Sequence, residues 1–156
     1  MSNFCQRMRR DHQRAVVSSC HRPNCDLRLG SWAPRGHIIL DLDRLIAERE
    51  AFRQEGPIAD FLVAFVAGGL QLVVVEMKSR HLGHKPARQL SGTMLLLRKL
   101  LAGERFWDLR LVLLHRGIRG IERDWLRRTK VEFQGREYSI ILKPCGVSIA
   151  EVLSLP

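Results

Sequence analysis

The chain has 156 residues, and its 26 Lys and Arg residues against 16 Asp and Glu residues give a net charge of +10. This length suits one compact domain with a real hydrophobic core, and it excludes a tandem array or a large multidomain enzyme. The 46% hydrophobic content excludes a disordered tail. The positive charge makes a polyanion the expected partner, with nucleic acid preferred to an anionic membrane surface.

Charge is distributed unevenly along the chain. Residues 1–35 carry a net charge of +5, residues 36–78 carry −3 and residues 79–143 carry +9. An acidic middle between two basic segments suits a site that holds a cation while its surroundings bind phosphates.

Residues 1–35 form the basic N-terminal segment, which is expected to be irregular because Pro23, Gly30 and Pro34 break it into turns. The segment lacks the apolar stretch of a signal peptide, and the longest apolar tract, 61–75, is too short to cross a bilayer. We therefore expect a cytoplasmic protein with no membrane contact. The four cysteines are then expected to be reduced thiols rather than a disulfide framework.

The same segment holds five potential zinc ligands. Cys5, His12, Cys20, His21 and Cys25 supply enough thiolates and imidazoles for a tetrahedral site. Their spacing matches no familiar zinc-binding pattern and contains no paired Cys-x-x-Cys. Incidental cysteines are the favoured interpretation, and a zinc-stabilised regulatory protein is the weaker alternative.

The elements are clearer from residue 38 onwards. Both strands of an expected hairpin at 58–77 are apolar almost throughout, so the hairpin should lie in the middle of a sheet covered on both faces. Trp107 is expected in the core. The order of elements predicts an α/β domain with a mixed central sheet flanked by helices. In chain order, the sequence predicts a strand at 38–40, a helix from Asp41 or Asp43 to about residue 54, strands at 58–66 and 70–77, a helix at 85–102, a strand at 107–114, a short helix at 118–127, a hairpin at 130–142 and a last helix capped by Ser148.

Two charged residues interrupt the apolar hairpin, Asp60 on its first strand and Glu76 on its second, and Lys78 follows two residues later. Glu76 and Lys78 share one face of their strand. A two-residue turn at 68–69 would send the carboxylate of Asp60 to the opposite face, whereas a three-residue loop at 67–69 puts Asp60 directly across from Glu76. Three-residue loops with a left-handed glycine are common hairpin closures, so we predict that the two carboxylates lie side by side.

Such a pair has a clear chemical use. Adjacent carboxylates repel each other unless a cation separates them, and Mg²⁺ prefers carboxylate oxygens with room for water. A metal held by Asp60 and Glu76 would polarise a phosphoryl oxygen and lower the pKa of a bound water, and Lys78 would orient that water or stabilise charge on the phosphate. The alternative is that Glu76 and Lys78 mark the solvent end of a strand and that Asp60 pairs with a neighbouring arginine.

A family resemblance rests on these residues. Ala59-Asp60, a hairpin, the run from Val73 to Lys78 and a helix containing Gln89 resemble the PD-(D/E)XK nuclease superfamily over roughly residues 38–115. The departure is Ala59, where the name of the family has proline.

The resemblance implies a restriction-endonuclease-like fold and assigns roles to individual residues. Asp60 and Glu76 would bind Mg²⁺ or Mn²⁺, Lys78 would assist the nucleophilic water, and Gln89 would lie near the site. The family often adds an acidic residue from the first helix, and the sequence does not choose among its three candidates, Glu48, Glu50 and Glu55.

Basic residues that follow the Glu-x-Lys triplet are candidates for phosphate contacts. We assign this role to Arg80, Lys85 and Arg88, which flank the triplet. His81 and His84 are candidate proton donors, although an exposed loop is the favoured interpretation. A second contact surface and an ordinary solvated helix face are both open for Arg123, Arg127, Arg128 and Lys130.

The sequence thus predicts a metal-dependent nuclease that hydrolyses phosphodiester bonds in nucleic acid, with DNA expected over RNA only through the resemblance. A chain of this size would need a second copy to cut both strands together, so a homodimer or larger complex is one expectation. The alternative is a catalytically inactive, nuclease-like module that binds nucleic acid or acts as a scaffold in a larger complex. Only the nuclease hypothesis predicts Mg²⁺ at Asp60 and Glu76.

Overall fold

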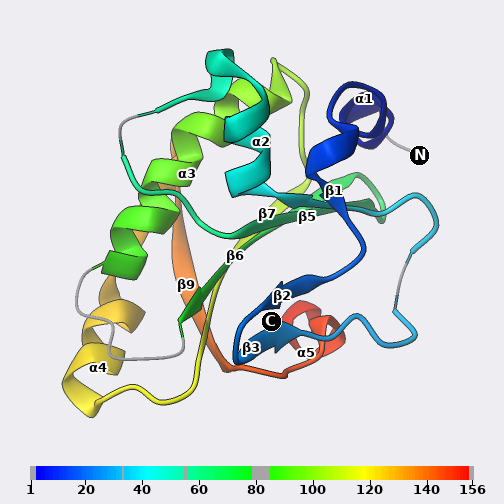
Figure 1. Ribbon diagram of the computed structural model, residues 1–156. Helices are drawn as coiled ribbons and strands as arrows, with labels where there is room; N and C mark the ends of the chain where they lie inside the picture. The colour runs from blue at the N-terminus through cyan, green and yellow to red at the C-terminus, as the bar shows by residue number, and fades with distance from the viewer. Residues whose placement is uncertain (1–2, 33, 55, 79–84, 155–156) are drawn as a thin grey trace.

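The computed structural model describes residues 3–32, 34–54, 56–78 and 85–154 (Figure 1). Its elements follow the chain in this order: α1 (Asn3–Asp11), η1 (Gln13–Ala15), β1 (Val16–Val17), β2 (Cys20–Arg22), β3 (Cys25–Leu27), β4 (Ile38–Asp41), α2 (Leu42–Glu48), η2 (Glu50–Phe52), β5 (Phe61–Val66), β6 (Leu70–Lys78), α3 (Lys85–Leu101), β7 (Asp108–His115), α4 (Gly120–Arg128), β8 (Lys130–Phe133), β9 (Arg136–Pro144) and α5 (Ile149–Leu153).

Within the described ranges, seven strands form one mixed sheet in the order β1-β4-β5-β6-β7-β9-β8, and β2 and β3 form a separate hairpin. The pairs β1–β4, β4–β5 and β5–β6 are antiparallel, whereas β6, β7 and β9 run parallel to one another. The parallel strands are linked by α3 and by α4 with β8, as parallel pairing requires long crossover connections. The predicted mixed α/β class is confirmed.

The sheet is covered on both faces. On one face lie α1, α2 and α3, and on the other lie the β2–β3 hairpin and α5 (Figure 1). Even-numbered residues of β5 and β6, such as Leu62 and Val74, face the helix-side core, and odd-numbered ones, such as Val63 and Val75, face the hairpin-side core. This two-sided burial explains the nearly continuous apolar sequence of the two central strands.

The loop between β5 and β6 has the predicted three residues. Val66 pairs with Leu70 and Phe61 with Val75, and Gly68 takes a positive φ of 74°. The backbone N–H of Ala67 donates to the carbonyl of Gly69 at 3.0 Å, which closes the turn. The register of the hairpin, on which the position of Asp60 depends, is therefore confirmed.

Most other predicted elements are confirmed within a few residues, including α3 and the β8–β9 hairpin. The side chain of Ser148 accepts the backbone N–H of Glu151, as the predicted cap of α5 requires. The predicted helix to residue 54 is too long, because α2 ends at Glu48 and a 3-10 turn follows. Trp107 is 69% exposed and lies over Gly69, so its predicted place in the core is wrong.

The expectation of an irregular N-terminal segment is also wrong. This segment forms α1, contributes β1 to the edge of the sheet and forms the β2–β3 hairpin. Phe4, Cys5 and Met8 of α1 are buried in the helix-side core, while Cys20, Cys25 and Leu27 belong to the hairpin-side core. The segment therefore supplies a layer on each face of the sheet.

The expectation of reduced thiols fails for two of the four cysteines. Cys25 on β3 and Cys145, directly after β9, form a disulfide across 120 residues of sequence.

Within the described part of the chain, no helix has the length and apolar character needed to cross a bilayer.

Candidate active site

The candidate site lies where β4 ends, β5 begins and β6 ends. Because β5 is antiparallel to both neighbours, these three strand ends lie next to one another. The strand register ends with Phe61 paired with Val75, and the backbone N–H of Asp60 donates to the carbonyl of the same Val75 at 3.1 Å. Asp60 therefore precedes β5 without a register partner of its own, and it is not directly across from Glu76 as predicted. The two carboxyl groups still interact, because Asp60 is among the causes that raise the pKa of Glu76.

Glu76 is almost completely buried, with 1% of its surface exposed. Its Oε1 lies 3.3 Å from Nζ of Lys78, which projects from the same face of β6. Its Oε2 is buried and has no hydrogen-bond partner among the described residues. Burial first, then the charge of Asp60 and a hydrogen bond between the two carboxyl groups, raise the pKa of Glu76 to about 9 against the opposing effect of Lys78. The carboxyl of Glu76 therefore keeps its proton at neutral pH unless a cation takes its place.

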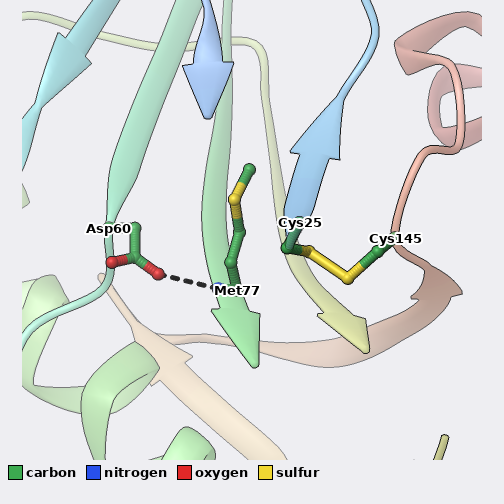
Figure 2. The surroundings of a disulfide bond; sticks show 4 residues. All are labelled: Cys25, Asp60, Met77 and Cys145. Atoms are coloured by element: carbon green, nitrogen blue, oxygen red, sulfur yellow. Dashed lines mark hydrogen bonds between the residues drawn. A yellow bond between two sulfur atoms is a disulfide. The ribbon is translucent and has the colours of Figure 1, made fainter. Parts of the chain in front are cut away.

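Asp60 has both carboxylate oxygens engaged. Its Oδ2 accepts the backbone N–H of Met77 at 2.8 Å (Figure 2). Its Oδ1 lies 3.2 Å from Nε of Arg22, which comes from the N-terminal hairpin. The alternative interpretation of the sequence, an Asp60 paired with an arginine, is thus correct for Asp60, although the carboxylates also meet as predicted.

Arg22 binds further carboxylates at the same edge. Its Nη1 lies 3.2 Å from Oδ2 of Asp41, and its Nη2 lies 3.6 Å from Oδ2 of Asp43. The guanidinium stacks over the ring of Phe61 at 4.3 Å from the ring centroid. One cation therefore links the end of β4, the first turn of α2 and the start of β5.

The sequence offered Glu48, Glu50 and Glu55 as a further acidic residue of the site. The acidic residues that α2 brings to the site are instead Asp41 and Asp43. Asp41 caps α2 by accepting the backbone N–H of Arg44 at 3.1 Å, and Asp43 is in the first turn, so both lie at the end of α2 that touches the site. Glu48 closes the same helix at its other end, and Glu50 lies beyond it in η2. Glu55 lies outside the described residues.

Gln89 lies on α3 beside the segment that leads into β5. Its Nε2 donates to the carbonyl of Ile58 at 3.4 Å, and its buried Oε1 has no hydrogen-bond partner in the described part of the chain. The side chain therefore contacts the backbone two residues before Asp60.

The candidate phosphate contacts lie on exposed parts of α3. Lys85 is the first residue of the helix, and Arg88 lines a groove with Trp125 and Lys130, between α3 and the start of β8. Arg80, together with His81 and His84, lies outside the described residues. The other basic candidates, Arg123, Arg127 and Arg128, are exposed on α4.

His115 is a further neighbour of the site. The parallel register of β6 and β7 pairs His115 with Lys78, and alternation puts both on the helix side of the sheet. Its Nδ1 is buried without a hydrogen-bond partner in the described ranges. Burial and the charge of Arg123 lower the pKa of His115, which favours a neutral imidazole. Nothing local in the sequence indicated this neighbour, because the pairing joins strands separated by a whole helix.

The five potential zinc ligands of the N-terminal segment do not assemble. Cys25 is in the disulfide, Cys5 is buried in the helix-side core, and Cys20 is buried in the hairpin-side core, where burial raises its pKa to about 12. His12 is buried with its ring 5.3 Å from that of Phe52. Across the described ranges, no three His, Cys, Asp or Glu side chains are grouped so as to hold a metal ion.

Comparison of the chain with protein-family models, with curated proteins and with solved structures found no match. The site must therefore be interpreted from its own geometry. It offers two adjacent carboxyl groups, one buried oxygen without a partner, an amine beside that carboxyl group, and a guanidinium that neutralises the more exposed acids.

Proposed function

We propose that this protein is a metal-dependent nuclease of the PD-(D/E)XK superfamily that hydrolyses phosphodiester bonds in nucleic acid, with DNA as the expected substrate. The observation that supports this best is the meeting of Asp60, Glu76 and Lys78, in which the two carboxyl groups interact and the amine of Lys78 lies 3.3 Å from Glu76. This is the arrangement that the Asp and Glu-x-Lys positions of the family require.

The order of elements around these residues gives further support. An antiparallel hairpin, β5 and β6, is followed by a helix, α3, and by a strand, β7, parallel to β6. This agrees with the restriction-endonuclease-like fold that the resemblance implies over roughly residues 38–115. The fold assignment remains part of the proposal.

The donor set suits a hard divalent cation. Mg²⁺ is commonly bound by one or two carboxylates and completes its shell with water and substrate phosphate, so the pair Asp60 and Glu76 is sufficient. Oε2 of Glu76 is buried and accepts no hydrogen bond from the described residues, so deprotonation would leave it open to a cation. Mg²⁺ or Mn²⁺ held there would polarise the phosphoryl oxygen and lower the pKa of a water.

The chain's own residues have distinct tasks in this scheme. Glu76 would hold the metal as a carboxylate, with its proton lost to solvent, and Lys78 would orient the attacking water or stabilise the negative charge that develops on the phosphate. Gln89 holds the backbone before Asp60 through the carbonyl of Ile58, which makes it a positioning residue.

Nucleic-acid binding is supported by charge. The chain carries a net charge of +10, and Lys85 and Arg88 are exposed on the helix that follows the site. Arginine and lysine contacts to phosphates release counterions, so binding is expected to weaken steeply with salt.

The test is cleavage of linear, circular, branched and single-stranded DNA, with RNA alongside, in Mg²⁺ or Mn²⁺. We expect Glu76→Gln and Lys78→Met to lower the cleavage rate by about 100-fold or more, because each removes a group that acts in the transition state. The controls are Glu137→Gln and Lys99→Met, which change exposed residues on β9 and at the end of α3. Undiminished cleavage by the Glu76 and Lys78 variants would contradict the proposal.

One observation favours the second candidate, a catalytically inactive module that binds nucleic acid or acts as a scaffold in a larger complex. The guanidinium of Arg22 already neutralises Asp41, Asp43 and Asp60 at distances of 3.2–3.6 Å. Salt-sensitive binding without cleavage of any of these substrates would favour this candidate.

A further inference from the structure

Arg22 occupies one side of the carboxylate pair. Both carboxylate oxygens of Asp60 are engaged, Oδ2 by the N–H of Met77 and Oδ1 by Nε of Arg22 at 3.2 Å, so a cation that binds either oxygen lies beside the guanidinium. A guanidinium and a divalent cation cannot both neutralise this carboxylate without repelling each other. A metal that uses Asp60 must therefore compete with Arg22.

The arginine is held by more than its ion pairs. It lies at the end of β2, and its partner in the hairpin register is Cys25 on β3. The disulfide from Cys25 to Cys145 joins this point to the segment after β9. Figure 2 shows Met77, whose N–H binds Asp60, between Asp60 and the disulfide.

Backbone hydrogen bonds reinforce the same attachment. The N–H of Gly146 donates to the carbonyl of Asp26 at 2.7 Å, and the N–H of Arg28 donates to the carbonyl of Val147 at 3.0 Å. These bonds hold β3, which pairs with β2, the strand that carries Arg22. β2 is also attached through Cys20, which is buried in the hairpin-side core, and through β1, which pairs with β4. The disulfide is thus the covalent part of a support that fixes the position of Arg22.

We propose that Arg22 is a built-in cationic latch on the site, which a divalent cation must displace from Asp60, and that the Cys25–Cys145 disulfide holds this latch closed. The inference rests on the proposed function, since the cation is the metal of the nuclease. It assigns regulation to the N-terminal hairpin.

Opening by reduction has a defined chemistry. A dithiol reductant transfers two electrons and two protons to the disulfide, the S–S bond breaks, Cys25 and Cys145 become thiols, and the reductant forms its own disulfide. The hairpin then keeps its backbone bonds but loses its cross-link, so Arg22 moves from Asp60 at a lower cost.

The experiment measures Mn²⁺ binding to the full chain by electron paramagnetic resonance of the free ion, without nucleic acid. Arg22→Gln is expected to tighten Mn²⁺ binding by roughly tenfold or more, because the guanidinium, 3.2 Å from Oδ1 of Asp60, strongly disfavours a second cation there. The added change Asp60→Asn should abolish that gain. Arg44→Gln is the matched control, since Arg44 lies 3.7 Å from Asp41 and has no ion pair with Asp60 among the described contacts.

The disulfide is tested in the same assay. Reduction of the wild type by dithiothreitol, or the double change Cys25→Ser and Cys145→Ser, should tighten Mn²⁺ binding by about threefold, because a cross-link of this kind restricts the chain. In the Arg22→Gln background neither treatment should add to the gain. This non-additivity distinguishes a latch from a general loosening of the fold.

Circular dichroism establishes that each variant is folded, and Arg22→Lys, which keeps the charge but loses the planar fork, serves if Arg22→Gln does not fold. Arg22→Lys should bind Mn²⁺ more tightly than the wild type by about twofold or more. Equal or weaker Mn²⁺ binding by the folded Arg22 variants overturns the inference, as does a gain that survives Asp60→Asn or a reduced wild type that binds no better.

Failure of the latch and failure of the nuclease give different results. Tighter Mn²⁺ binding by Arg22→Gln without cleavage of any nucleic acid supports the latch and removes the nuclease. Metal-dependent cleavage by the wild type, with no gain in Mn²⁺ binding by Arg22→Gln, supports the nuclease and overturns the latch.

Discussion

Thr93 on α3 accepts the backbone N–H of Ala59 through its hydroxyl oxygen at 2.7 Å. The same hydroxyl donates to the carbonyl of Gln89 at 2.6 Å, and both Ala59 and Thr93 are buried. The middle of the long helix is thereby joined to the residue that immediately precedes Asp60. This contact sets the point at which the chain enters β5.

Replacement of Thr93 by valine should destabilise the protein. Valine has nearly the same shape but no hydroxyl, so the buried N–H of Ala59 would lose its acceptor at a cost of about 1–3 kcal/mol. Thr93→Ser keeps the hydroxyl and is the matched control. Urea denaturation measures the free energy of unfolding, and a Thr93→Val protein as stable as the wild type would show that the hydrogen bond contributes nothing.

Gly92→Ala should also destabilise the fold, although alanine is the better helix former. A methyl group at Gly92 would overlap the backbone carbonyl oxygen of Pro57, so α3 or the segment before β5 must shift. Overpacking of this kind costs about 1–3 kcal/mol, more than the roughly 1 kcal/mol that helix propensity returns. The control is Ser91→Ala at the exposed neighbouring position. A Gly92→Ala protein as stable as Ser91→Ala in thermal unfolding would contradict this expectation.

The local features of the site were predictable because they depend on short-range rules. Strand parity puts Glu76 and Lys78 on one face, and the loop 67–69 fixes the register of β5 and β6 up to the pair Phe61 and Val75, beside Asp60. The spacing of apolar residues predicts the helix α3, and the position of Ser148 predicts where α5 begins. Each of these inferences joins residues that are near in sequence.

The features that the sequence did not predict join distant residues. Arg22 reaches Asp60 across 38 positions, and Cys25 reaches Cys145 across 120. The edge strand β1 has two residues and pairs with β4, which lies more than 20 residues later in the chain. No local pattern marks such contacts, since they depend on how the layers pack.

The stability of the protein should fall as the pH rises through the range set by Glu76. The pKa of this group is about 9 in the folded protein and near its ordinary value of 4.5 when unfolded. The native state therefore binds one more proton than the unfolded state between these values, and the resulting stability is present below pH 4.5 and lost by about pH 9.

Glu76→Gln tests this directly, because glutamine imitates the protonated carboxyl group and does not titrate. The variant and the wild type should have similar free energies of unfolding near pH 5, and the variant should be the more stable near pH 8, without divalent cations. Urea denaturation across this range gives both curves. Parallel curves for the two proteins would mean that the carboxyl group of Glu76 is not held in its neutral form.

Loss of the disulfide should destabilise the protein through the unfolded state. The cross-link between Cys25 and Cys145 closes a loop of 120 residues, so its removal frees a long segment of the unfolded chain at an expected cost of about 2–5 kcal/mol. The measurement is urea denaturation of Cys25→Ser with Cys145→Ser, compared with the oxidised wild type. Dithiothreitol should lower the stability of the wild type toward that of the double variant and leave the double variant unchanged. An effect of dithiothreitol on the double variant would place the sensitivity elsewhere, whereas no effect on the wild type would mean that the cross-link does not constrain the chain.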